Sequence, residues 1–131
     1  GMLRVLLADD QAWLRSALRF LLEQESGVEV IGEAGDARAL LAKAQNTRPN
    51  LVLLDWELPG MRAVGGGPNL LVALHKSCPN ISVIVLSGRP EASSSALDAG
   101  VDFFVSKADP PESLLAALRA VKQSNDEPAV H

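Results

Sequence analysis

Short apolar runs alternate with amphipathic stretches five times along the chain. The runs have the length and aliphatic content of buried β-strands, and they are Leu3–Ala8, Val28–Glu33, Leu51–Asp55, Ile81–Ser87 and Val101–Ser106. Between them, apolar residues recur at three- and four-residue spacing, which is the period of a helix with one buried face. The alternation predicts an α/β fold with a parallel sheet covered by helices on both faces.

Polar residues inside the runs indicate the order of the strands. The first, third and fourth runs are apolar at their centres, as inner strands are, whereas Glu29 and Glu33 mark the second run and Asp102 marks the fifth as edges. The order 2-1-3-4-5, the doubly wound flavodoxin-like arrangement, satisfies this pattern. Ligands are then expected beyond the carboxyl ends of strands one and three, where the winding direction reverses.

Proline, glycine and capping residues mark the helix boundaries. The third helix is expected to begin near Pro68, and the fourth to run from about Pro90 to a stop at Gly100. Within Asp109–Glu112, an aspartate suited to capping precedes two prolines and a glutamate, which predicts that Asp109 caps the last helix.

Length and composition predict one globular domain of 131 residues, with 1–122 folded and 123–131 a tail or linker stub. The single cysteine, Cys78, permits no internal disulfide and suits a reducing cytoplasm. The longest apolar runs, such as Ile81–Leu86, fall far short of the roughly 20 residues of a membrane span, and no signal peptide is visible. The net charge of −4 argues against nucleic-acid binding by this chain itself.

Three carboxylates, a hydroxyl and an amine fall at the carboxyl ends of the predicted strands: Asp9, Asp10, Asp55, Ser87 and Lys107. Carboxylates brought together repel one another unless a pKa rises or a cation neutralises them. An oxygen-rich set of this kind suits Mg²⁺, which also binds phosphate oxygens. A carboxylate can itself attack phosphorus to give an aspartyl phosphate, with the metal and the amine stabilising the transferred group.

The motifs resemble those of the receiver domain of two-component response regulators. The matching segments are Ala8–Asp10, Leu53–Met61, Val85–Gly88 and Ala99–Lys107, and the resemblance covers roughly residues 3–122. It implies that Asp55 is the phosphoacceptor and, with the backbone carbonyl of Glu57, a ligand of Mg²⁺. It also implies that Asp10 binds the metal directly and Asp9 binds it through water.

The resemblance assigns the phosphoryl oxygens to Lys107 and Ser87, helped by the backbone amides of Trp56 and Gly88. A partner histidine kinase or phosphotransfer protein would supply the phosphoryl group, and the domain would assist its own phosphorylation rather than act as an enzyme on other substrates. Ser87 would then move and Phe104, the switch aromatic, would turn inward. The face formed by helix four, strand five and helix five would change shape for an output domain, a downstream protein or a second copy.

Two departures and three alternatives accompany this interpretation. The segment Arg62–Gly67 is longer than usual in the family and is expected to be mobile, and the lysine is followed by Ala108 where many members have proline. Lys107 to Asp109 resembles the branch that precedes a LuxR-type helix-turn-helix domain. The alternatives are aspartates that only cap the first helix, a Mg²⁺-dependent phosphatase or phosphotransferase of small molecules, and a receiver that is never phosphorylated.

Overall fold

The computed structural model, which describes residues 1–126, contains a five-stranded parallel sheet in the order β2-β1-β3-β4-β5. The strands are β1 (Leu3–Ala8), β2 (Val28–Ala34), β3 (Leu51–Asp55), β4 (Ser82–Ser87) and β5 (Phe103–Ser106). The predicted fold class, strand order and edge strands are therefore confirmed.

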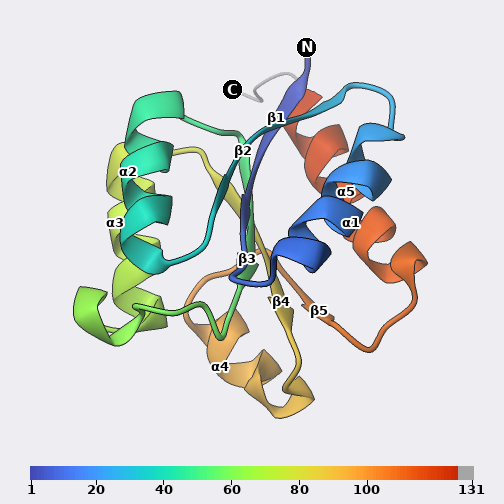
Figure 1. Ribbon diagram of the computed structural model, residues 1–131. Coiled ribbons are helices and arrows are strands. Elements are labelled where there is room, and N and C mark those ends of the chain that lie inside the picture. Colours follow the sequence, from blue (N-terminus) through green and yellow to red (C-terminus); the bar gives the residue numbers. More distant parts are fainter. Residues whose placement is uncertain (127–131) are drawn as a thin grey trace.

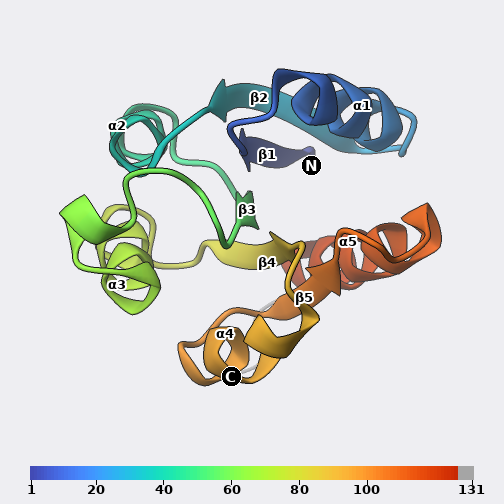
Figure 2. The same cartoon turned by 60° about the horizontal axis from the view of Figure 1, so that its bottom comes forward.

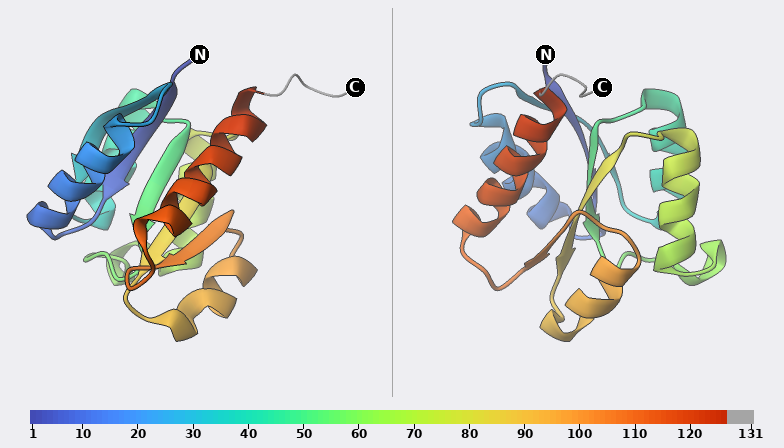
Figure 3. Two further views of the ribbon diagram at one scale, coloured as in Figure 1. Left: turned by 90° about the vertical axis from the view of Figure 1, so that its right-hand side faces the viewer. Right: turned by 180° about the vertical axis from the view of Figure 1, so that it is seen from behind.

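Helices cover both faces of the sheet, as Figures 1 and 2 show from two directions. One face carries α2, α3 and α4, and the other carries α1 and α5, so the molecule has three layers (Figure 3). The helices are α1 (Ala12–Glu23), α2 (Ala37–Thr47), α3 (Gly67–Ser77), α4 (Ser93–Asp98) and α5 (Pro111–Asp126), with 3₁₀ turns η1 (Arg62–Val64) and η2 (Pro90–Ala92).

Successive side chains of each strand point to opposite faces of the sheet, so the strands contribute to two separate apolar cores. In β3, Val52 and Leu54 face the layer of α2 and α3, while Leu51 and Leu53 face the layer of α1 and α5. All four side chains are buried, so β3 is apolar on both faces until it ends at Asp55. The sheet therefore holds the carboxylate of Asp55 at a fixed position on its edge.

The helix boundaries differ from the predictions in three places. The predicted fourth helix is split into η2 and the short α4, whose Ser93–Ser95 start provides no apolar stripe to extend it. Asp109 does not cap α5: the helix begins at Pro111, and the Asp109 carboxylate accepts a hydrogen bond from the Ser106 amide at 3.2 Å instead. The helix also continues to Asp126, four residues into the predicted tail, and 127–131 lie outside the described residues.

The segment Arg62–Gly67 lies between β3 and the body of α3, with Gly67 as the first residue of that helix. It contains η1, and the amide of Gly66 donates to the carbonyl of Met61 at 2.8 Å. Gly65 and Gly66 both take positive φ angles, of 91° and 95°, which glycine adopts without strain. In residues 1–126 no helix combines the length and the hydropathy needed to cross a bilayer.

Candidate functional site

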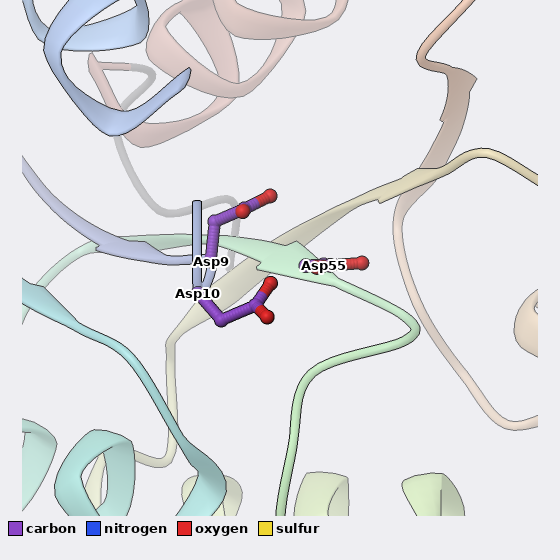
Figure 4. Close-up of side chains that lie close together, drawn as sticks. All are labelled: Asp9, Asp10 and Asp55. Atoms are coloured by element: carbon purple, nitrogen blue, oxygen red, sulfur yellow. The ribbon is translucent and has the colours of Figure 1, made fainter. Parts of the chain in front are cut away.

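Three carboxylates from two adjacent strands gather at the carboxyl edge of the sheet. Asp9 and Asp10 directly follow β1, and Asp55 ends the neighbouring β3 (Figure 4). One oxygen atom of each lies within 4.8 Å of the others. Asp9 and Asp55 are buried, with 2% and 3% of their surface exposed, whereas Asp10 is exposed to solvent. The predicted acidic set therefore forms one pocket with an open side.

Lys107, which follows β5, brings an amine to this pocket. Its Nζ lies 2.9 Å from Asp9 Oδ2 and 3.4 Å from Asp55 Oδ2. Burial by itself lowers the pKa of Lys107, but the carboxylates of Asp9 and Asp55 outweigh it, so the pKa is raised. The lysine therefore stays charged at neutral pH and interacts with both buried carboxylates.

The side chains of Asp9 and Asp55 are held by the same kind of turn. Asp9 Oδ1 accepts a hydrogen bond from the amide of Gln11 at 2.8 Å, and Asp55 Oδ1 accepts one from the amide of Glu57 at 2.9 Å. In each turn the carboxylate bonds the backbone two residues on, which fixes the side chain and leaves Oδ2 for other partners. The capping alternative is wrong for α1, because its N-cap residue is Gln11 and no side chain caps the helix.

The pocket holds more negative than positive charge. Burial raises the pKa of Asp55, and the nearby Asp9 carboxylate adds to this, while the Glu57 amide and Lys107 act in the opposite direction. The Oδ2 atom of Asp9 is buried, and its partner within residues 1–126 is the Lys107 ammonium, 2.9 Å away, which also faces Asp55 at 3.4 Å. Three carboxylates that share one ammonium fit the ligand set of a hard divalent cation.

The end of β4 adds Ser87 to the site, and this residue is fully buried. Its hydroxyl donates to Oε2 of Glu57 at 2.7 Å and accepts a hydrogen bond from the amide of Arg89 at 3.0 Å. The amide of Gly88 donates to the other Glu57 carboxylate oxygen at 3.0 Å. Two of the four groups that the resemblance assigns to the phosphoryl oxygens thus share one partner, the side chain of Glu57.

The two predicted aromatic positions, Trp56 and Phe104, both pack against the core on the side of α2, α3 and α4. Trp56 follows Asp55, donates its amide to the carbonyl of Leu86 at 2.9 Å, and packs its ring against Gly67. A Cβ atom at Gly67 would come within 2.5 Å of that ring, so the start of α3 fits only glycine there. Phe104 in β5 is half-buried against the core on the side of α2, α3 and α4, next to the face expected to change shape.

Two features of the site were missed by sequence reasoning. One is the side chain of Glu57, for which only the backbone carbonyl was given a role. The other is Arg15 of α1, whose Nη1 donates to the backbone carbonyl of Asp9 at 2.6 Å while its Nε pairs with Glu33 at 2.8 Å. Nothing in the sequence pattern pointed to either contact, because both depend on where long side chains reach in the folded molecule.

Comparison with known proteins decides the family. The family model of the response regulator receiver domain matches residues 5–119. The chain belongs to this family. Receiver domains are the regulatory domains of response regulators in two-component signalling. The resemblance predicted from the motifs at the strand ends is therefore confirmed.

Among curated relatives, the receiver is 34% identical over 119 residues to the nitrate/nitrite response regulator NarP of Escherichia coli, covering 89% of this chain and 54% of NarP. It is 30% identical over 119 residues to the response regulator VraR of Staphylococcus aureus, covering 89% of this chain and 55% of VraR. The chain thus spans about half the length of the curated relatives it matches.

Among solved structures, the isolated receiver domain of RcsB from Salmonella enterica, determined with the phosphomimetic BeF₃⁻, superimposes with a TM-score of 0.83 at 30% identity. The match covers 94% of this chain and 90% of that domain. A LuxR-family response regulator from Aurantimonas matches with the same TM-score of 0.83 at 25% identity, covering 95% of this chain and 87% of that one. The chain therefore has the fold of the receiver domains of these response regulators.

Proposed function

We propose that this receiver is a switch that accepts a phosphoryl group on Asp55, from a phosphohistidine of a histidine kinase or phosphotransfer protein, in the presence of Mg²⁺. The observation that supports this most directly is the buried Asp55 carboxylate beside two further aspartates, with the Lys107 amine 3.4 Å from its Oδ2. No arrangement that merely stabilised the fold would need three carboxylates around one amine.

Asp55 is the nucleophile of the proposed transfer. Its carboxylate oxygen forms the bond to phosphorus, and the bond from phosphorus to the histidine nitrogen of the donor breaks. The hydrogen bond from the Glu57 amide to Oδ1 fixes the carboxylate and leaves its other oxygen, 3.4 Å from the Lys107 amine, for the bond to phosphorus. Lys107, held between Asp9 and Asp55, supplies positive charge to the incoming phosphoryl oxygens.

Asp9, Asp10, Asp55 and the backbone carbonyl of Glu57 would hold the cation. Bound there, Mg²⁺ would neutralise the repulsion between the aspartates and the incoming phosphoryl group and stabilise the charge of the transfer. The amide of Gly88 and the hydroxyl of Ser87 would receive the remaining phosphoryl oxygens, whereas the amide of Trp56, predicted for the same role, donates to the Leu86 carbonyl at 2.9 Å. Arg15 holds the loop that carries the two aspartates through its bond to the Asp9 carbonyl.

The output of the switch is the face formed by α4, β5 and α5. Ser87 lies at the end of β4, next to β5, and Phe104 pairs in register with Val85 of β4. Movement of the Ser87 hydroxyl toward a phosphoryl group would open space into which the half-buried Phe104 turns. The short α4, with its serine-rich start, is the element most readily shifted by this change.

The whole protein to which this domain belongs would be a cytoplasmic transcription regulator. The RcsB structures that it resembles include one bound to promoter DNA, which matches with a TM-score of 0.83 at 28% identity and covers 61% of that longer chain. DNA would then be bound by a separate domain and not by this receiver, whose net charge is −4. Phosphorylation would favour a homodimer that presents two such domains together.

The test is phosphorylation with acetyl phosphate and Mg²⁺, followed by intact-mass measurement. One phosphoryl group should be added per chain, none without Mg²⁺, and none in Asp55→Asn, which should keep the same fold by circular dichroism. Release of phosphate over many turnovers from small phosphate esters would instead indicate a phosphatase. Absence of any Mg²⁺-dependent uptake would indicate a receiver that works without phosphorylation.

A further inference from the structure

The Glu57 carboxylate occupies two hydrogen-bond donors at the site. Its Oε2 accepts the hydroxyl proton of Ser87 at 2.7 Å, and its Oε1 accepts the amide proton of Gly88 at 3.0 Å. Ser87 is fully buried, while Glu57 is exposed and reaches in from solvent. The hydroxyl lies closer to Glu57 than to its other acceptor, the Arg89 carbonyl at 3.3 Å, so its proton points to the carboxylate.

This contact has the chemistry of anion binding. A carboxylate presents two oxygens that share one negative charge. Here each oxygen accepts one hydrogen bond, and the two donors are consecutive residues at the end of β4. Two oxygens of a phosphoryl group on Asp55 would need the same O–H and N–H donors. Because each donor has a single proton, the carboxylate and the phosphoryl group compete for them.

We propose that the side chain of Glu57 is a built-in competitor of the phosphoryl group, holding Ser87 and Gly88 until phosphorylation of Asp55 displaces it. The inference rests on the proposed function and adds a gate to it. The gate lies beside the nucleophile, because the backbone amide of Glu57 also holds Asp55 Oδ1 at 2.9 Å. One residue therefore fixes the acceptor through its backbone and blocks the oxygen donors through its side chain.

The displacement also acts on the segment that leads to α4. The Ser87 hydroxyl accepts the amide proton of Arg89 at 3.0 Å, and η2 begins at the next residue, Pro90. While Glu57 holds Ser87 and Gly88, the end of β4 and the first residue of this loop are tied to the loop after β3. Displacement of the carboxylate removes that tie, so the loop and α4 move together with the hydroxyl.

The experiment compares wild type with Glu57→Ala, which keeps the backbone amide and carbonyl in place. At saturating Mg²⁺, beryllofluoride is titrated and its binding is followed by Trp56 fluorescence, with Mg²⁺ binding measured alone beforehand. Glu57→Ala should bind beryllofluoride about tenfold more tightly, as expected when one charge-assisted competitor is removed. Phosphorylation by acetyl phosphate should be faster by a similar factor.

The matched control is Glu91→Ala. Glu91 carries the same charge on the loop that follows Ser87, but it pairs with Arg89 at 3.2 Å on the surface. This variant should bind beryllofluoride as wild type does. The proposal is overturned if Glu57→Ala binds no more tightly than wild type, or if Glu91→Ala gains as much, since the gain would then come from net charge alone.

A double-mutant cycle tests the contact without phosphorylation. Urea unfolding of wild type, Glu57→Ala, Ser87→Ala and the double variant in metal-free buffer should give non-additive losses of stability. The non-additivity should vanish when Mg²⁺ and beryllofluoride are bound. Additive losses in the metal-free protein would refute the competition by Glu57, whatever the outcome of the phosphorylation experiment. If the losses are non-additive but the protein takes up no phosphoryl group, only the proposed function is refuted.

Discussion

Two charged clusters lie at the carboxyl ends of adjacent strands, and their charges are balanced in opposite ways. The first is centred on Glu33 near the end of β2. Arg15 Nε and Arg19 Nη2, both from α1, each lie 2.8 Å from one of its carboxylate oxygens. Hydrogen bonds from Arg19 and then Arg15 hold the pKa of Glu33 below its ordinary value. Two cations pair with Glu33, one of them shared with Glu23 at 3.2 Å, and each carboxylate oxygen of Glu33 has a donor.

The second cluster is the acidic pocket of Asp9, Asp10, Asp55 and Lys107, where three anions share one amine. Burial and the neighbouring Asp9 raise the pKa of Asp55, in the direction opposite to Glu33. Within the described residues, the buried Asp9 Oδ2 atom has only the Lys107 ammonium as a partner, and it shares that ammonium with Asp55. The complete set of partners around Glu33 stabilises the fold. In the acidic pocket one amine does not balance three carboxylates, so the carboxylates repel one another, and a bound cation would remove this unfavourable electrostatic energy.

The first prediction tests the deficit with Mg²⁺ itself. At about one hundred times its dissociation constant, Mg²⁺ should raise the free energy of unfolding by about 2.7 kcal/mol, because it binds only the folded pocket. Thermal unfolding with and without the ion measures this. Asp10→Asn should lose most of the gain, and Glu33→Gln should keep it. An equal gain in all three proteins would mean that the ion binds elsewhere.

The second prediction concerns the metal-free protein. Asp55→Asn should raise the free energy of unfolding by about 1 kcal/mol, because the amide has no buried charge to desolvate and Lys107 remains paired with Asp9. Urea unfolding in the presence of a chelator gives the value. If the variant proves less stable than wild type, Asp55 is already compensated by Lys107 and the pocket is not in deficit.

The same comparison separates what the sequence predicts from what it does not. Asp55 and Lys107 could be placed together because each ends a strand, and the carboxyl ends of parallel strands share an edge. The contacts of Arg15 and of the Glu57 side chain could not, because they depend on side-chain rotamers that only the packed structure sets. The local signal at Asp109 was misleading, since its carboxylate bonds the Ser106 amide rather than the helix.

The boundaries of the last two helices were also beyond a pattern-based prediction. Pro90 correctly marked the start of helical structure, but the run of serines after it leaves only a 3₁₀ turn followed by the short α4. At the other end, α5 extends to Asp126 without any apolar position in its last residues, because a helix already held by Leu118 and Val121 can continue into solvent.

The third prediction concerns the balanced cluster. Glu33→Gln should lower the free energy of unfolding by about 0.5–1 kcal/mol at pH 7, since the pairs are partly exposed and screened by solvent. A carboxyl whose pKa is lowered by folding stabilises fully above its ordinary value of 4.5 and loses this contribution as pH falls through the lowered value. The difference between variant and wild type should therefore shrink as the pH falls below 4.5, measured by urea unfolding across pH. A constant difference would point to packing instead.

The smallest effect is expected where the two clusters meet, at Arg15. Its Nε pairs with Glu33 and its Nη1 holds the carbonyl of Asp9, so one guanidinium ties the balanced cluster to the loop that carries the acidic pair. Arg15→Lys keeps the charge but has one donor group, which cannot reach both acceptors in this fork-like geometry. The affinity for Mg²⁺, measured by titration, should fall about threefold, equivalent to about 0.6 kcal/mol. Arg19→Lys, which also touches Glu33 but not Asp9, serves as the control and should leave the affinity unchanged. If both variants weaken Mg²⁺ binding equally, the effect comes through the charge of Glu33, and if neither does, the Asp9 loop is positioned by the sheet alone.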